Sequence, residues 1–308
     1  MKKKFNFFDF YFYYLKLILP RFFQIKNPKI INLFKRKTIE FMVHIVGQKC
    51  NLKCKDCCNF TPLMPQIFYS YENQINNLKK ISQCVNIELL QIQGGEPLLW
   101  DKLEDFLKDI LAMNFVKNIQ IATNGTKKPS PSFIKFLKLH NQITIRISPY
   151  PGVSDKQGNK LYEELTLERI NVGKHLFANA SGDWSYLGGP DFKELSPKEG
   201  IYNFNNCVFR KCLTLEDGIL ARCSRGPTAY QVQKFEPYKN DLFSFKEIFK
   251  NDYEFTKKFL GYVFNPQPMR ACNFCNGTNG EPIVAGKQFR KKEWEESFKA
   301  VNFLKIKS

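Results

Sequence analysis

The sequence predicts an α/β protein in which strands and helices alternate to build a parallel sheet. Two observations support this class: short apolar runs recur along residues 39–180, and amphipathic stretches of helical length separate them. The strands are expected at 39–46, 87–92, 118–122, 142–147 and 172–177, and the helices at 71–83, 101–113, 132–139 and 155–169. Because ligands of such sheets bind at the carboxyl ends of the strands, polar motifs that follow a strand are the first candidates for a site.

The element at 87–92 is the clearest strand, since its continuous apolar run is typical of a strand that is buried on both faces. Asp101 opens the helix that follows it. The apolar positions of that helix recur at helical spacing, at Leu103, Phe106, Leu107, Ile110 and Leu111.

The composition indicates an ordinary globular chain with reduced thiols. The 308 residues are 43% hydrophobic, which is enough for one large or two modest domains. Ten cysteines are too few for a disulfide scaffold of this length, and several lie at metal-ligand spacing. We therefore expect a cytoplasmic protein.

The net charge of +18 is concentrated near the two ends of the chain. Residues 1–40 contain ten Lys and Arg against two acidic residues, and residues 287–308 contain seven against three. Such charge suits nucleic acid, a membrane surface or an acidic substrate. No motif that reads RNA or DNA is visible, so nucleic-acid binding is not predicted.

The N-terminal segment, residues 1–38, begins Met-Lys-Lys-Lys and continues with an aromatic run. It imitates a signal peptide, but Asp9 and Lys16 interrupt the run and no small-residue cleavage site follows. Two interpretations remain open. The segment forms a helix on an anionic membrane surface, or it packs on the rest of the protein or on a partner subunit.

Three cysteines follow the first predicted strand in a C-x3-C-x2-C pattern, at Cys50, Cys54 and Cys57. Thiolates are soft ligands that suit iron–sulfur clusters or zinc. A structural zinc site usually takes four protein ligands. Three thiolates on a short loop instead match a [4Fe–4S] cluster that keeps one iron open for a small molecule.

A second motif, Gln93-Gly94-Gly95-Glu96-Pro97, follows the strand at 87–92. Two glycines at a strand end let the backbone come close to a ligand. Together with the cysteine loop, this motif resembles the radical SAM superfamily. The resemblance implies a partial (β/α)6 barrel in which the open iron binds S-adenosylmethionine and Gly94, Gly95 and Glu96 meet its amino group.

The resemblance also implies S-adenosylmethionine contacts at two further strand ends. Asn124 lies in a Thr-Asn-Gly turn, where a plain turn is the alternative. Arg146 and Ser148 share one face of the fourth strand and are expected to meet the carboxylate and the ribose, with ordinary ion pairing as the alternative. Asp56 departs from the family pattern, in which an aromatic residue precedes the third cysteine.

The C-terminal part holds a predicted hairpin with an Asp217-Gly218 turn, and its five cysteines are Cys207, Cys212, Cys223, Cys272 and Cys275. This arrangement resembles a SPASM or twitch domain, in its shorter form with one auxiliary [4Fe–4S] cluster. A four-cysteine zinc site is the alternative. The sequence leaves open whether Cys207 or Cys212 is the ligand.

These predictions divide the chain into the N-terminal segment (1–38), a radical SAM core (39–190) and a small cysteine-rich auxiliary-cluster domain with a basic tail (191–308). The resemblance implies an oxidoreductase that cleaves S-adenosylmethionine and abstracts a hydrogen atom from a sugar, small metabolite or peptide. It also implies an electron donor such as flavodoxin or ferredoxin. The alternative function is a zinc-binding module with a basic membrane or nucleic-acid surface. The substrate, the general base and the oligomeric state are not predicted.

Overall fold

The computed structural model describes residues 36–174 and 184–301. The chain divides into two compact units, Met1–Lys37 and Thr38–Ser308, and the description below concerns the second. Residues 1–35 of the N-terminal segment lie outside the described residues, as do 175–177 at the end of the fifth predicted strand.

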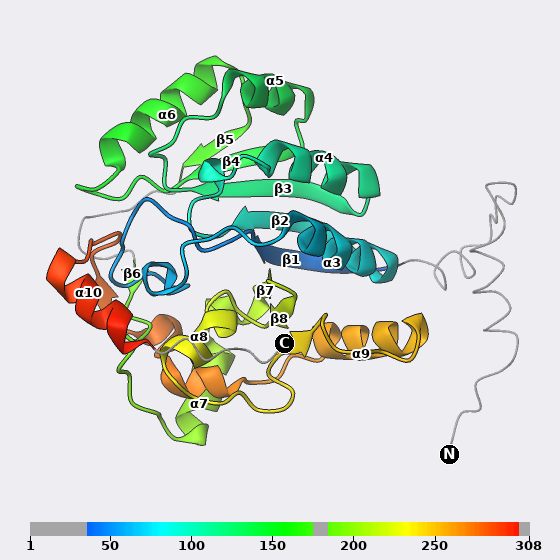
Figure 1. The fold of residues 1–308 in the computed structure, drawn as a ribbon, viewed down its shortest axis with the longest axis vertical. Helices are drawn as coiled ribbons and strands as arrows, with labels where there is room; N and C mark the ends of the chain where they lie inside the picture. The colour runs from blue at the N-terminus through cyan, green and yellow to red at the C-terminus, as the bar shows by residue number, and fades with distance from the viewer. Residues whose placement is uncertain (1–35, 175–183, 302–308) are drawn as a thin grey trace, which may run out of the picture. The chain divides into compact units, whose positions relative to one another are not determined.

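An eight-stranded sheet has the order β5-β4-β3-β2-β1-β7-β8-β9 (Figure 1). Its strands are β1 (Lys37–Ile45), β2 (Val85–Gln93), β3 (Val116–Thr123), β4 (Ile143–Ile147), β5 (Val172–Lys174), β7 (Leu213–Glu216), β8 (Ile219–Ala221) and β9 (Phe243–Ser244). Neighbours from β2 to β5 pair in parallel, with Ile119 of β3 opposite Ile143 of β4. The predicted α/β class with a parallel sheet is confirmed.

Four helices connect these strands: α3 (Tyr71–Cys84), α4 (Leu103–Met113), α5 (Pro131–Leu139) and α6 (Asp155–Leu167). Each begins and ends within two residues of its prediction. In α4 the buried residues Leu103, Phe106, Leu107 and Ile110 share one face, as the helical spacing requires. Burying each such side chain stabilises the fold by about 1.5 to 3 kcal/mol, which holds α4 against the sheet.

The C-terminal hairpin extends the main sheet. Strand β7 pairs in parallel with β1, with Met42 opposite Leu213, and β8 and β9 continue antiparallel. The predicted Asp-Gly turn joins β7 to β8, and both of its residues have positive φ, 44° at Asp217 and 77° at Gly218. The boundary at 190 stays a prediction, because the sheet runs on into the residues that follow it.

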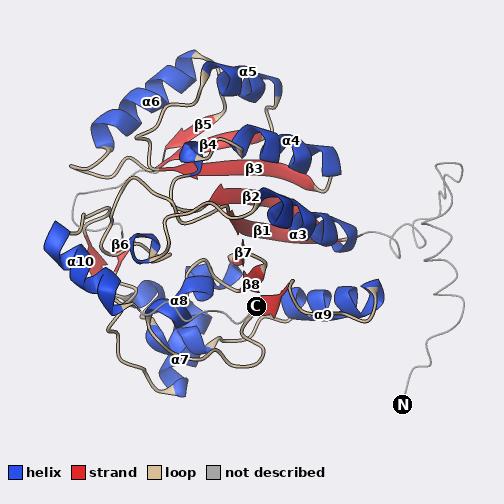
Figure 2. Cartoon of the chain, in the orientation of Figure 1, coloured by secondary structure: helices blue, strands red, loops and turns tan. Residues whose placement is uncertain are grey.

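Short helices and long loops make up most of the chain after β5 (Figure 2). The remaining elements are β6 (Trp184–Ser185), α7 (Pro197–Asn206), α8 (Gly226–Val232), α9 (Asp252–Phe264), β10 (Pro282–Ile283) and α10 (Lys291–Ala300). A second apolar cluster packs Phe60 and Leu63 against Val232, Met269 and Phe274. The loop after the first cysteines and the C-terminal cysteine region are therefore held on one another. None of the helices in the described ranges combines the length and apolar character that a membrane crossing would need.

Candidate active site and cysteine-lined cavities

The first cysteine loop, residues 48–58, leaves the carboxyl end of β1 and borders a cavity of about 480 Å³, called the large cavity below. Cys50, Cys54 and Cys57 all line it. Burial raises the pKa of the Cys50 thiol to about 12, and the charge of Cys57 adds to the shift. Burial also raises the pKa of Cys54, with contributions from Cys57 and Cys50. The three thiols thus lie close enough to influence one another, and a metal that binds them must displace their protons.

The two glycines of the second motif lie directly against this loop. Gly95 donates a backbone hydrogen bond to the carbonyl of Gly47 at 2.9 Å, and Glu96 donates one to Lys49 at 2.9 Å. A Cβ atom on Gly95 would lie 2.9 Å from the Cβ of Cys50 and closer still to the Lys49 backbone. Only glycine allows the end of β2 to pack this tightly on the cysteine loop.

The carboxylate of Glu96 is fully buried and faces the protein rather than the large cavity. It accepts hydrogen bonds from the Thr123 hydroxyl at 2.7 Å, the Asn124 amide at 2.7 Å and the Leu98 amide at 3.1 Å. Burial raises its pKa to about 7. Glu96 therefore connects the ends of β2 and β3, while its predicted contact with S-adenosylmethionine stays a prediction.

The other predicted contacts, Gly94, Gly95, Asn124, Arg146 and Ser148, all line the large cavity. Asn124 donates to the side chain of Asn51 at 3.0 Å and lies 3.9 Å from the Cys50 sulfur. The Nε of Arg146 is buried and has no hydrogen-bond partner among the described residues. A guanidinium group with an unused donor beside a cavity suits a carboxylate ligand.

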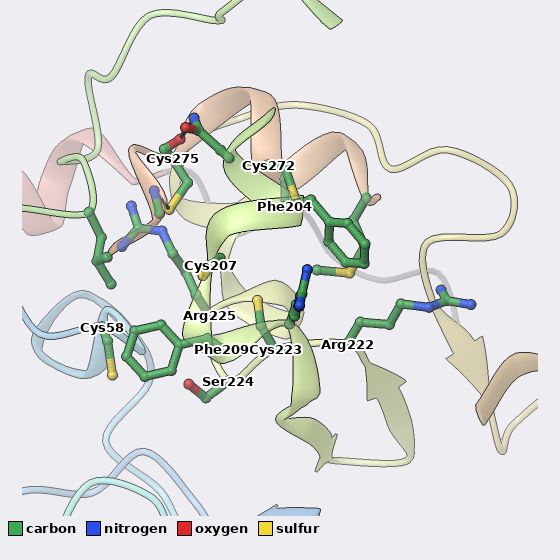
Figure 3. A pocket seen from close by; sticks show the side chains of 16 residues that line it. Cys58, Phe204, Cys207, Phe209, Arg222, Cys223, Ser224, Arg225, Cys272 and Cys275 are labelled. Atoms are coloured by element: carbon green, nitrogen blue, oxygen red, sulfur yellow. Dashed lines mark hydrogen bonds between the residues drawn. The ribbon is translucent and has the colours of Figure 1, made fainter. Parts of the chain in front are cut away.

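A small cavity of about 50 Å³ lies among the C-terminal cysteines (Figure 3). Cys207, Cys223, Cys272 and Cys275 line it. They come from the end of α7, the residue pair after β8, and the short 3-10 helix η4 (Arg270–Phe274) with the residue that follows it. Burial raises the pKa of Cys272 to about 12, and the charges of Cys275 and Cys207 add to the shift. The fold thus gathers four thiols from three separate segments.

Cys212 does not line the small cavity. It borders the large cavity together with Cys58, which reaches both spaces. The sequence left Cys207 and Cys212 as alternatives, and the structure places Cys207 with the other three C-terminal thiols.

Arg225 lies between the two groups of thiols, beside Cys275 and Cys223 on one side and Cys58 and Cys57 on the other. Its side chain is buried, with its carbon Cζ 4.0 Å from the centre of the Phe60 ring. It donates to the Gly188 carbonyl at 2.5 Å, while its Nε has no hydrogen-bond partner among the described residues. A buried cation is costly unless an anion balances it. The groups that can do so beside Arg225 are the carboxylate of Asp56 and these thiols, which become anionic when they bind a metal. This observation, with the soft donor set, fits an anionic metal–thiolate centre.

Within the described residues, no three His, Cys, Asp or Glu side chains are placed to hold a single metal ion. A [4Fe–4S] cluster differs from a single ion because each thiolate binds a different iron.

No family model matches the chain. Among curated proteins, it is 34% identical over 104 residues to the GTP 3',8-cyclase of Campylobacter jejuni (strain RM1221), which covers 31% of this chain and 30% of that protein. It is 32% identical over 87 residues to the GTP 3',8-cyclase of Aquifex aeolicus, covering 25% of each. The matches therefore span less than a third of these relatives.

The fold is similar to the crystal structure of BtrN in complex with AdoMet and 2-DOIA. The TM-score is 0.51 at 13% sequence identity, over 82% of this chain and 98% of BtrN. Both findings agree with the resemblance to the radical SAM family. The resemblance stated from the cysteine loop and the glycine motif is thus confirmed, while the auxiliary domain is treated as a proposal below.

Sequence reasoning missed two residues at the first cysteine loop. Gln288 donates a hydrogen bond to the Cys54 sulfur at 3.2 Å, and Arg225 lies beside Cys57. Gln288 is 234 positions away from Cys54, and no motif marks it. The Cys-x-Arg spacing from Cys223 to Arg225 was a sequence signal for Arg225. An arginine two positions from a metal-binding cysteine can balance the negative charge of the thiolate.

Proposed function

We propose that the protein is a radical SAM enzyme that cleaves S-adenosylmethionine and abstracts a hydrogen atom from a bound substrate. The observation that carries this proposal is the large cavity, where three cysteines meet the glycine motif and the polar ends of β3 and β4. A [4Fe–4S] cluster on these cysteines would supply the electron for reductive cleavage of S-adenosylmethionine to methionine and a 5'-deoxyadenosyl radical.

The residues of the large cavity have distinct roles in this proposal. Cys50, Cys54 and Cys57 would hold the cluster, and the backbone of Gly94 and Gly95, which lines the cavity, would bind the amino group of S-adenosylmethionine. Arg146 pairs with the carboxylate through its unused Nε donor, and Ser148 and Asn124 donate to hydroxyl groups. Together these contacts would fix the orientation of S-adenosylmethionine in the cavity.

We propose an auxiliary [4Fe–4S] cluster on Cys207, Cys223, Cys272 and Cys275, as in a twitch domain. Four thiols around one space and the buried Arg225 charge support it. The substrate would bind in the part of the large cavity near Trp184, Phe209 and Cys212, between the two clusters. A nearby electron acceptor suits a two-electron oxidation.

Hydroxyl and aromatic side chains on this part of the wall, Ser185, Ser224, Thr278, Trp184 and Phe209, suit a polar sugar, a small metabolite or a peptide side chain. The enzyme would act in the cytoplasm, where a flavodoxin or a ferredoxin would supply its electrons.

Anaerobic reconstitution with iron and sulfide tests the proposal. The native chain should bind about eight irons in two clusters and, with dithionite and S-adenosylmethionine, form 5'-deoxyadenosine measured by mass spectrometry. The variant Cys54→Ala should form none. A colourless protein that purifies with zinc and leaves S-adenosylmethionine intact would instead support the zinc-binding module.

A further inference from the structure

The segment after the last cysteines, residues 286–289, pairs with the first cysteine loop. Lys55 donates a backbone hydrogen bond to Lys287 at 2.8 Å, and Phe289 donates one to Lys53 at 2.8 Å. Cys54 and Gln288 face each other as an antiparallel bridge. A segment far along the chain thus forms one wall of the cluster-binding loop.

The side chain of Gln288 is held in one orientation at this bridge. Its Oε1 accepts a hydrogen bond from the Lys53 backbone amide at 2.7 Å. Its Nε2 donates to the Gly286 carbonyl at 2.5 Å and to the Cys54 sulfur at 3.2 Å. Because a backbone amide can only donate, it selects the oxygen of Gln288 and directs the NH2 group toward the sulfur.

The helix that follows fixes this segment to the loop. Trp294 donates from its indole nitrogen to the Pro62 carbonyl at 2.7 Å, and the Nζ of Lys53 lies 3.2 Å from the centre of the Trp294 ring. Lys55 and Glu293 form an ion pair at 2.5 Å. Figure 1 shows α10 beside the loop that follows β1. These contacts leave Gln288 little freedom to move away from Cys54.

We propose that Gln288 is a positioning residue that stabilises the Cys54 thiolate and raises the reduction potential of the cluster on the first cysteine loop. The inference rests on the proposed function. Reduction adds negative charge to the cluster, and a hydrogen bond to a ligand sulfur becomes stronger as that charge grows. Such hydrogen bonds are one of the means by which proteins set iron–sulfur potentials.

The test compares two variants by redox titration followed by EPR. Gln288→Glu keeps an acceptor for Lys53 but loses the N–H donor, and Gln288→Met loses both groups. A net hydrogen-bond energy of about 0.5 to 1.5 kcal/mol predicts a reduction equilibrium about 2- to 10-fold less favourable in Gln288→Met, and more than that in Gln288→Glu. Gln267→Met, at an exposed glutamine, should leave the potential unchanged.

The auxiliary cluster serves as an internal reference, because its potential should stay constant in both variants. Unchanged potentials of the first cluster at full iron content would overturn the inference. If a variant loses iron, the native chain still provides a test, since side-chain 15N-glutamine should show hyperfine coupling to the reduced cluster in pulsed EPR. No coupling in the native chain would also overturn it.

The two proposals fail in different ways. If the native chain binds no [4Fe–4S] cluster and forms no 5'-deoxyadenosine, the proposed function fails. If it does both and the Gln288 variants keep the native potential, only the role of Gln288 fails.

Discussion

The carboxylate of Glu96 accepts a hydrogen bond of 2.7 Å from the backbone amide of Asn124, and this contact ties the end of β2 to the end of β3. Two more donors, the Thr123 hydroxyl and the Leu98 amide, complete its environment. The acidic residue of the glycine motif therefore stabilises the wall of the large cavity without lining the cavity itself.

Replacing Glu96 with alanine should destabilise the protein strongly. Three buried donors would lose their acceptor, at a cost of about 1 to 3 kcal/mol each, so the total should exceed about 3 kcal/mol. Anaerobic urea unfolding measures this. Glu88→Ala removes a largely exposed carboxylate on β2, the strand that precedes Glu96, and should cost less than about 1 kcal/mol. Similar losses in the two variants would contradict the role given to Glu96.

Gly95→Ala should prevent assembly of the first cluster. The new Cβ atom would collide with the Lys49 backbone and lie 2.9 Å from the Cys50 Cβ, so the cysteine loop would have to shift. Iron analysis should show the content of one cluster instead of two. Gly261→Ala is the control, because nothing lies within 4 Å of a Cβ at that position in α9. A Gly95→Ala protein with full iron would argue against this close packing.

Cys207→Ser and Cys212→Ser should behave differently. Cys207 lines the small cavity with the three other C-terminal thiols of the proposed cluster, so its loss should destabilise the auxiliary cluster and remove about half of the iron. Cys212 lines the large cavity, so its serine variant should keep both clusters and alter substrate turnover instead. Iron content and EPR of the reduced proteins separate the two. Loss of the auxiliary cluster in Cys212→Ser alone would reverse the assignment.

Ionisation of the buried Glu216 carboxyl group should lower the stability of the protein as pH rises. Burial raises its pKa from 4.5 to about 7, so the folded state holds this proton more tightly than the unfolded state. The stability it contributes is complete below pH 4.5 and is lost as pH rises through about 7, a change of roughly 3 kcal/mol.

Glu216→Gln removes this titration and keeps an acceptor for Tyr69 and Gln48, which bond one carboxylate oxygen at 2.6 and 2.5 Å. In thermal unfolding under anaerobic conditions, the Tm of the variant relative to that of the native chain should rise by several degrees between pH 5.5 and pH 8. A constant difference in Tm across this range would contradict the prediction.

Removing the charge of Arg225 should lower the potentials of both clusters, because the guanidinium lies beside thiols of each group. Arg225→Met keeps much of the apolar stem, and Arg225→Lys keeps the charge. EPR redox titrations should show lower reduction potentials of both clusters in Arg225→Met and potentials closer to the native values in Arg225→Lys. Equal potentials in the native chain and Arg225→Met would mean that Arg225 acts only through its contact with Phe60 and its hydrogen bond to Gly188.

Local sequence patterns were sufficient for most elements of the sheet and its helices. The apolar positions of α4 and the run in β2 satisfy their periodicities, and the Asp217-Gly218 turn is a local property of two residues. The position of β7 was not predictable in this way. It pairs with β1 rather than continuing beyond β5, because strand neighbours depend on long-range packing.

The sequence by itself determined the soft donors and the resemblance to the radical SAM family, since the spacing of Cys50, Cys54 and Cys57 and the two glycines are local properties of the chain. Only the tertiary structure decided which thiols share a cavity and which side chains surround them. Cys207 joins Cys272 and Cys275, and Gln288 reaches Cys54, through contacts between distant segments. Such contacts depend on how apolar faces pack, and this packing follows from the whole chain rather than from any local motif.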